Sequence, residues 1–277
     1  MKPLLNTLVF CLLLLSHQSN DLPHKLTKLW ETDTLLRTPE SVLVDSKNKR
    51  LFVSNIDGAP AEKDGKGFIS ILSLDGKPIN LEWIKGLNAP KGMGIYKNKL
   101  YVADLTELVV IDIEKATILQ KIPVEGAVFL NDITIDNKGT VFISDTRGFN
   151  IYQYDQQRIS VTMRNLKRPN GLLINDKDLF ILDNGSLLAL NLNGQLLQLM
   201  EGMDPSTDGI EKVKTDEFIV SAWEGVIYYV TAFKTKEVLL DSRKEKKNTA
   251  DIGYDAKNRI LYVPTFYGNK LVAYKLD

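Results

Sequence analysis

The 277-residue chain has only one cysteine and two histidines. Cys11, His17 and His24 all lie before the first repeated segment, so the rest of the chain carries neither a thiol nor an imidazole. This absence excludes disulfides, Ser-His-Asp triads, Cys-His dyads and the usual zinc ligand sets from the folded body. Any chemistry must use carboxylates, amides, lysine, tyrosine or a hard metal ion.

An excess of charge of either sign is also missing. Lys and Arg number 35 and Asp and Glu number 35, so the formal net charge is zero. No block of basic residues and no aromatic platform motif compensates for this balance. The composition therefore predicts no nucleic-acid partner.

Long apolar runs are scarce, and the exception lies at the N-terminus. Lys2 is followed by an almost wholly apolar stretch from Leu4 to Leu15, and polar residues follow it. About a dozen residues are too few to span a bilayer, and the order of charge, apolar stretch and polar end is typical of an export signal. We predict that residues 1–20 are a signal peptide and that the mature protein is periplasmic or secreted, without a membrane span. An uncleaved anchor is the alternative.

One pattern recurs six times along the chain, with a spacing of 38 to 51 residues. Each copy starts with a polar residue beside a small or apolar one, and continues with short apolar strands separated by turns. The polar residues are Glu40, Lys91, Asn131, Asn170, Asp208 and Asp251. Because a four-stranded propeller blade takes roughly 40 to 50 residues, the sequence predicts an all-β, six-bladed β-propeller over residues 26–277. We expect a monomer.

The two ends of the repeat region predict how the ring closes. The sixth repeat stops at its third strand, 271–274, while the segment 26–30 precedes the first repeat. That segment can supply the missing fourth strand and cover an edge that would otherwise invite aggregation.

The first strand of each propeller blade lines the central channel, so equivalent positions in the six repeats converge there. The side chains brought together would be mostly carboxylates and amides, with Asp132 beside them. Carboxylates this close repel one another, and a divalent cation relieves the repulsion. Oxygen ligands without sulfur or imidazole favour Ca²⁺, then Mg²⁺ or Mn²⁺.

Two alternatives stay open at these positions. Pro-Asn-Gly and Thr-Asp-Gly are common turn sequences, so each motif alone is more often a turn than a ligand. The ammonium of Lys91 can neutralise one carboxylate, which weakens the need for a metal, or face a substrate anion.

A second polar set lies where the second strands end: Asn55, Asp104, Asp145 and Asp183. We expect these side chains to cap loop backbone, with support of the site or substrate contact as the alternative. Arg147 is a candidate anion contact. Among the aromatic residues, Trp83, Trp223, Phe266 and Tyr267 are predicted to pack within blades.

Four of these motifs resemble the metal-ligand motifs of the senescence marker protein/gluconolactonase/luciferin-regenerating family, and more distantly those of the paraoxonases. They are Pro39-Glu40, Leu130-Asn131-Asp132, Pro169-Asn170-Gly171-Leu172 and Thr207-Asp208-Gly209. The resemblance covers residues 35–277 and implies a calcium-dependent hydrolase of lactones or related esters. It implies that Glu40, Asn170 and Asp208 hold the metal, that Asn131 contacts metal or substrate, and that Asp208 doubles as general base.

Two departures from the family pattern leave a second function open. Sugar-lactonase members carry an arginine where this chain has Phe129, and the paraoxonase histidine dyad has no counterpart. The alternative is a non-catalytic propeller, similar to NHL-repeat scaffolds, that binds a small molecule, glycan or protein on its channel face. Lys91 and Phe129 favour this alternative, whereas the carboxylate and amide set favours the hydrolase.

Overall fold

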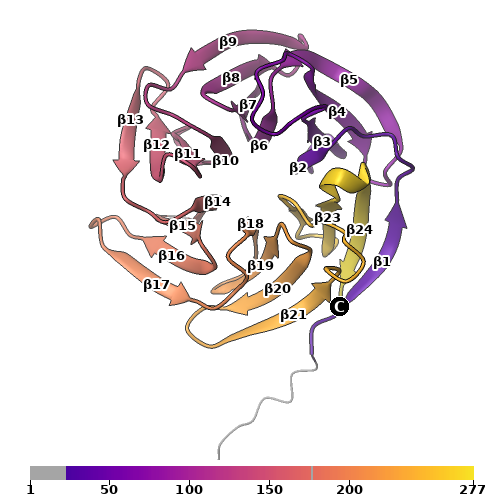
Figure 1. Ribbon diagram of the computed structural model, residues 1–277, viewed down its shortest axis with the longest axis vertical. Coiled ribbons are helices and arrows are strands. Elements are labelled where there is room, and N and C mark those ends of the chain that lie inside the picture. The colour runs from indigo at the N-terminus through magenta and orange to yellow at the C-terminus, as the bar shows by residue number, and fades with distance from the viewer. Residues whose placement is uncertain (1–22, 176) are drawn as a thin grey trace, which may run out of the picture.

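Six four-stranded antiparallel sheets surround a central axis in the computed structural model, which describes residues 23–175 and 177–277 (Figure 1). The predicted all-β, six-bladed propeller is confirmed. The predicted signal peptide, residues 1–20, lies outside the described residues.

In five blades the strands run in chain order from the axis to the rim, and in the sixth the rim strand is the N-terminal one. The innermost strands are β2 (Pro39–Asp45), β6 (Pro90–Tyr96), β10 (Leu130–Ile135), β14 (Pro169–Asn175), β18 (Thr207–Lys214) and β22 (Gly253–Asp255). The second strands are β3 (Arg50–Asn55), β7 (Lys99–Asp104), β11 (Val141–Asp145), β15 (Asp178–Asp183), β19 (Glu217–Ala222) and β23 (Ile260–Pro264). The third strands are β4 (Gly67–Ser73), β8 (Glu107–Asp112), β12 (Asn150–Tyr154), β16 (Ser186–Leu190), β20 (Val226–Thr231) and β24 (Leu271–Leu276). The rim strands are β5 (Pro78–Leu87), β9 (Thr117–Pro123), β13 (Ile159–Met163), β17 (Leu196–Met200), β21 (Thr235–Asp241) and β1 (Leu26–Glu31).

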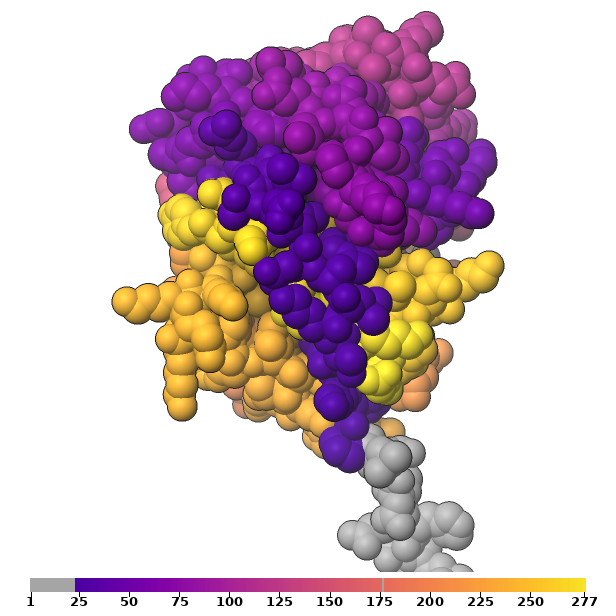
Figure 2. Space-filling view, turned by 90° about the vertical axis from the view of Figure 1, so that its right-hand side faces the viewer, coloured from indigo at the N-terminus to yellow at the C-terminus, as the bar shows by residue number. Residues whose placement is uncertain are grey.

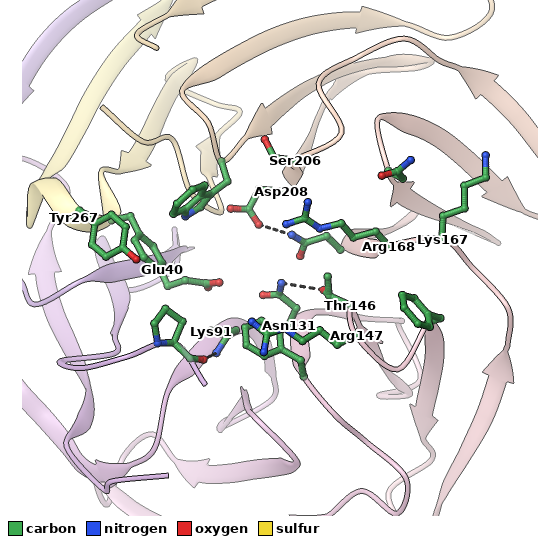
Figure 3. Close-up of a pocket in the computed structure, with 17 residues that line it drawn as sticks. Glu40, Lys91, Asn131, Thr146, Arg147, Lys167, Arg168, Ser206, Asp208 and Tyr267 are labelled. Carbon is green, nitrogen blue, oxygen red and sulfur yellow. Dashed lines mark hydrogen bonds between the residues drawn. The ribbon is translucent and has the colours of Figure 1, made fainter. Parts of the chain in front are cut away.

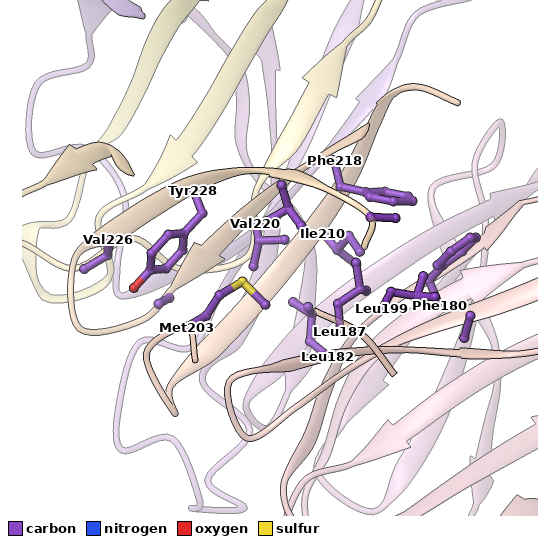
Figure 4. Close-up of a cluster of buried hydrophobic side chains, with 14 residues drawn as sticks. Phe180, Leu182, Leu187, Leu199, Met203, Ile210, Phe218, Val220, Val226 and Tyr228 are labelled. Carbon is purple, nitrogen blue, oxygen red and sulfur yellow. The ribbon is translucent and has the colours of Figure 1, made fainter. Parts of the chain in front are cut away.

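The hydrophobic core lies between neighbouring blades. Second and third strands are buried on both faces, whereas rim strands such as β9 leave most side chains exposed. One cluster joins β15 and β16 to β19 and β20, with Phe180 and Phe218 packed at a centroid distance of 4.9 Å (Figure 4). This packing explains why the second and third strands have short continuous apolar sequences rather than an alternating pattern.

The ring closes through a sheet shared by the two ends of the chain. Its strand order is β1-β24-β23-β22, and Leu26 pairs with Leu276. The N-terminal strand lies along the last strand on the outside of the ring (Figure 2). The predicted closure by residues 26–30 is therefore confirmed.

Helical structure contributes one short turn to the described residues, the 3₁₀ segment η1 (Phe266–Gly268) between β23 and β24. No helix in 23–175 or 177–277 is long and apolar enough to cross a membrane.

Candidate functional site

A cavity of about 550 Å³ opens at one mouth of the central channel (Figure 3). We call it the upper cavity. Its lining combines the starts of inner strands with the loops that follow second strands: Glu40, Pro60, Lys91, Phe129, Asn131, Thr146, Arg147, Phe149, Lys167, Arg168, Asn170, Asn184, Ser206, Asp208, Trp223, Phe266 and Tyr267. All four predicted metal ligands are thus brought together in one cavity.

A repeated β-bulge places these side chains. In β10, Asn131 and Asp132 face the single residue Ser144 of β11. Ser144 Oγ accepts a hydrogen bond from the Asp132 amide at 2.9 Å, so the bulge leaves that amide paired. The same register shift occurs in the other four long inner strands. A bulge turns one extra side chain out of the ladder, and the structure shows that these motifs lie in strands rather than turns.

The two residues of the β10 bulge point to different parts of the channel. Asn131 lines the upper cavity, whereas Asp132 lines a second cavity of about 240 Å³ farther along the axis, the lower cavity. Asp251 also lines the lower cavity, where its carboxylate accepts a hydrogen bond from Ser41. Asp132 Oδ2 accepts the Leu172 amide at 2.6 Å. Asp132 and Asp251, two predicted additional residues of the site, therefore line the lower cavity instead of the upper one.

Glu40 and Asp208 are the two carboxylate residues of the upper cavity, and they are 5% and 3% exposed. Burial and repulsion by Asp208 raise the pKa of Glu40 well above its usual value, against the opposing charge of Lys91. Burial and repulsion by Asp251 raise the pKa of Asp208 to about 8, although Asn170 and Arg168 act in the opposite direction. Both carboxyls therefore lack a partner that compensates their negative charge fully.

The amide of Asn131 is held in one orientation by its neighbours. Thr146 Oγ1 donates to the Pro169 carbonyl at 2.8 Å, so it can only accept from Asn131. Asn131 Nδ2 makes that bond at 3.0 Å, which turns Asn131 Oδ1 toward the cavity.

The amide of Asn170 is oriented in the same way by a carboxylate. Asn170 Nδ2 donates to Asp208 Oδ1 at 2.7 Å. Its oxygen, Oδ1, is buried and has no hydrogen-bond partner within the described chain, and the same holds for Glu40 Oε2. Buried acceptors without a donor are costly, so these two oxygens are the strongest sign that the cavity takes a ligand.

The donor set fits a hard divalent cation. Two carboxylates and two amide oxygens face the cavity, and such ligands suit Ca²⁺. Within 23–175 and 177–277, no group of three or more His, Cys, Asp or Glu side chains is arranged to hold a metal ion. An ion in the upper cavity would therefore depend on Asn131 and Asn170 as much as on Glu40 and Asp208.

Lys91 is almost fully buried, but it does not pair with a described carboxylate. Its Nζ donates to the carbonyls of Ala89 and Pro60 at 2.8 and 3.2 Å, and it lies 4.4 Å from the centre of the Phe129 ring. Burial lowers its pKa to about 8, while Glu40 acts in the opposite direction. Lys91 thereby anchors the loop that carries Pro60 above the cavity.

The second polar set caps loop backbone, as predicted. Asp145 is fully buried and accepts the amides of Val128, Phe129 and Gly148 at 2.8 to 2.9 Å. Asp145 therefore supports the loop that places Phe129, and it does not line the cavity. Arg147, two residues later, does line it.

Sequence reasoning missed an aromatic corner. Trp223, Phe266 and Tyr267 make mutual edge-to-face contacts, with ring centroids 4.8 to 5.9 Å apart, and all three line the cavity. The prediction that they only pack within blades is incomplete. Phe266 and Tyr267 lie in η1, outside the strand pattern that marks the repeats, so the pattern gave no signal for them.

Comparisons with known proteins show the fold of this chain. No protein-family model matches it, and no curated protein matches it in sequence. A catalytically inactive histidine-to-alanine variant of virginiamycin B lyase from Staphylococcus aureus, with quinupristin, is 14% identical with a TM-score of 0.64. That likeness covers 92% of this chain and 100% of the lyase.

Two further structures are similar to this chain. A streptogramin B lyase is 11% identical, with a TM-score of 0.66, and the match covers 92% of this chain and 98% of that one. A nidogen/laminin complex contains a chain 17% identical, with a TM-score of 0.65, over 78% of this chain and 84% of that one. At these identities the likeness concerns the fold alone, so membership of the gluconolactonase-like family stays a prediction.

Proposed function

We propose that this propeller is a divalent-metal-dependent hydrolase of lactones or related esters, with Ca²⁺ as the preferred ion. The observation that carries the proposal is the pair of buried, unpartnered oxygens, Glu40 Oε2 and Asn170 Oδ1, in the upper cavity. Glu40, Asn131, Asn170 and Asp208 would hold the ion. Mg²⁺ and Mn²⁺ are the alternatives for the same ligands.

When bound, the ion would supply Lewis-acid chemistry, polarising the carbonyl and lowering the pKa of the attacking water. Asp208 accepts the proton of that water as its oxygen attacks the carbonyl carbon. The ester C–O bond then breaks, and the proton passes from Asp208 to the departing alkoxide oxygen. Asn170 holds Asp208 in position through its 2.7 Å hydrogen bond.

The neighbouring lyases suggest another chemistry, which this chain does not support. The S. aureus lyase is inactive when a histidine is replaced by alanine. The upper cavity here has no histidine in its lining. His24 lies instead against Tyr229, with a ring-centroid distance of 3.6 Å, and contacts Glu237.

Metal-dependent stability tests the metal site. We expect the melting temperature of the wild type to rise by about 5 °C with Ca²⁺ at 100-fold its dissociation constant. Binding to the folded state adds ~2.7 kcal/mol to the free energy of unfolding. Glu40→Gln should lose most of this response. Glu82→Gln, at an exposed carboxylate paired with Lys85, should keep it. An equal response of both variants, or none in the wild type, would contradict the site.

Turnover separates the hydrolase from a binding propeller. A lactone and ester panel should show hydrolysis that disappears on metal removal and in Asp208→Ala. Ca²⁺-dependent melting without any turnover would instead support a non-catalytic propeller.

We also propose that the protein acts after export, in the periplasm or outside the cell. The apolar stretch from Leu4 to Leu15, preceded by Lys2 and followed by polar residues, supports this. N-terminal sequencing of the protein from its source cells tests cleavage near residue 20, and an intact Met1 would argue against it.

A further inference from the structure

The upper cavity is strongly cationic, although the whole chain is neutral. Four cations line it, Lys91, Arg147, Lys167 and Arg168, against two carboxylates. The cations exceed the carboxylates by two charges, and a bound divalent ion would raise the excess to four. A concave site with one sign of charge concentrates ligands of the opposite sign.

Three of these cations remain available to a ligand. Arg147, Lys167 and Arg168 are exposed at the rim. Across residues 23–175 and 177–277, none of the three forms an ion pair. Figure 3 shows Arg147 and Arg168 on the same side of the cavity.

The backbone that carries the two arginines is held firmly. The amide of Arg168 donates to Asp183 at 2.6 Å, and the preceding amide of Lys167 donates to the same carboxylate. The Arg147 guanidinium lies 4.2 Å from the centre of the Phe129 ring. Phe129 is in turn fixed by Asp145. A stacked guanidinium such as that of Arg147 loses little entropy when it binds a carboxylate, and the fixed backbone of Arg168 places its side chain at the rim.

The opposite side of the cavity is aromatic. Trp223, Phe266 and Tyr267 form the corner, and Tyr267 is 63% exposed. In Figure 3, Glu40 and Asp208 lie between Tyr267 and the arginines. An exposed aromatic ring beside a polar site offers a surface on which a flat or apolar group can rest.

We propose that the substrate is an amphipathic carboxylate, an anionic lactone or ester with an aromatic or apolar group. Its carboxylate binds Arg147 and Arg168, its apolar group rests on Tyr267, and its reacting carbonyl lies between them above Glu40, Asn131, Asn170 and Asp208. This assignment rests on the hydrolase proposed above. Arg147, Arg168 and Tyr267, however, lie in the cavity walls, and their contribution to binding can be measured without turnover.

Binding of a product-like probe tests the walls. Protein is stripped of metal, freed of chelator by gel filtration, and titrated by calorimetry with 3-phenylpropionate and with its neutral amide. We expect the carboxylate to bind at least tenfold more tightly. In the double variant Arg147→Gln/Arg168→Gln this ratio should approach one, whereas in the exposed control Lys85→Gln it should not change. Equal affinities in the wild type, or a ratio unchanged in the double variant, would overturn the anion site.

Tyr267→Ala tests the aromatic half. We expect weaker binding of both probes by a similar factor of about three to ten, with the carboxylate preference kept. Unchanged affinities would overturn the role of Tyr267. Failure of these titrations alongside metal-dependent turnover of neutral lactones would sink this assignment and leave the hydrolase standing. Selective binding of the carboxylate without any turnover would support the anion site and contradict the hydrolase.

Discussion

Asp145 shows how a single carboxylate can organise a site that it never touches. Its two oxygens accept three loop amides, and the loop that they hold carries Phe129. Phe129 in turn lies against Lys91 and Arg147. Asp104 and Asp183 hold the equivalent loops of their blades. The walls of the cavity therefore depend on buried anions one layer behind them.

Asp145→Ala should lower the free energy of unfolding by about 3 kcal/mol, because three partly buried loop amides lose a charged acceptor. Asp145→Asn should cost less, since Asn55 accepts the Arg37 amide through a single oxygen at the equivalent position of blade one. Urea unfolding at constant slope measures both. Asp75→Ala, in an exposed turn, is the control and should change little. A loss no greater than that of the control would show that Asp145 is not a structural acceptor.

The sequence predicted the four oxygen-bearing residues of the site because equivalent positions of a closed repeat must converge. It could not predict the orientation of the amides. That orientation depends on Thr146, which donates to Pro169 and so accepts from Asn131. Nor could it separate Asn131 from Asp132, which point to different cavities because of a bulge.

At the scale of the strand, glycine at three of the five bulges lets the inner strand approach the next blade closely. An ideal Cβ on Gly171 would lie 2.2 Å from the Asp208 carbonyl oxygen of the next inner strand. An ideal Cβ on Gly92 or Gly209 would lie 2.4 Å from a carboxylate oxygen of the following blade, that of Asp132 or of Asp251. The Pro-Asn-Gly and Thr-Asp-Gly motifs are therefore bulges in strands β14 and β18, where backbone meets backbone. Sequence patterns alone do not distinguish this close approach from a turn.

Gly171→Ala should push β14 and β18 apart, and with them Asn170 and Asp208. We expect a loss of about 1 to 3 kcal/mol from overpacking, together with a smaller Ca²⁺-induced rise in melting temperature. Gly58→Ala is a suitable control, because its nearest contact is the end of the Asp64 side chain at 3.0 Å. Melting curves with and without Ca²⁺ for both variants decide the matter. A Gly171→Ala protein with the stability and Ca²⁺ response of the control would disprove the role of this contact.

At the scale of the whole molecule, β1 is the strand that removes the last open edge. Leu26 and Trp30 pair with β24, and the Asp277 amide donates to the Lys25 carbonyl at 3.0 Å. Trp30 also covers Gly76 of blade one and lies 5.9 Å from the ring of Tyr262. The sequence predicted this closure because repeat six lacked a strand that the N-terminal segment could supply.

A chain that starts at Thr32 should melt at a lower temperature and self-associate, since β24 would present an unpaired edge. Differential scanning calorimetry and size-exclusion chromatography measure the two effects. Lys28→Ala in the full chain changes an exposed side chain of β1 and leaves the backbone pairing intact, so it should behave like the wild type. A monomeric truncated chain with an unchanged melting temperature would show that the ring does not need β1.

The pairing of β1 with β24 also sets an order for synthesis. Thr27 and Asp277, which are hydrogen-bonded, are 250 residues apart in the chain. Strand β1 must wait for β24, the last strand to be made, and until then five blades can complete their own sheets while the sixth cannot. Loss of a few C-terminal residues would consequently shorten β24 and also leave β1 without its pairing partner.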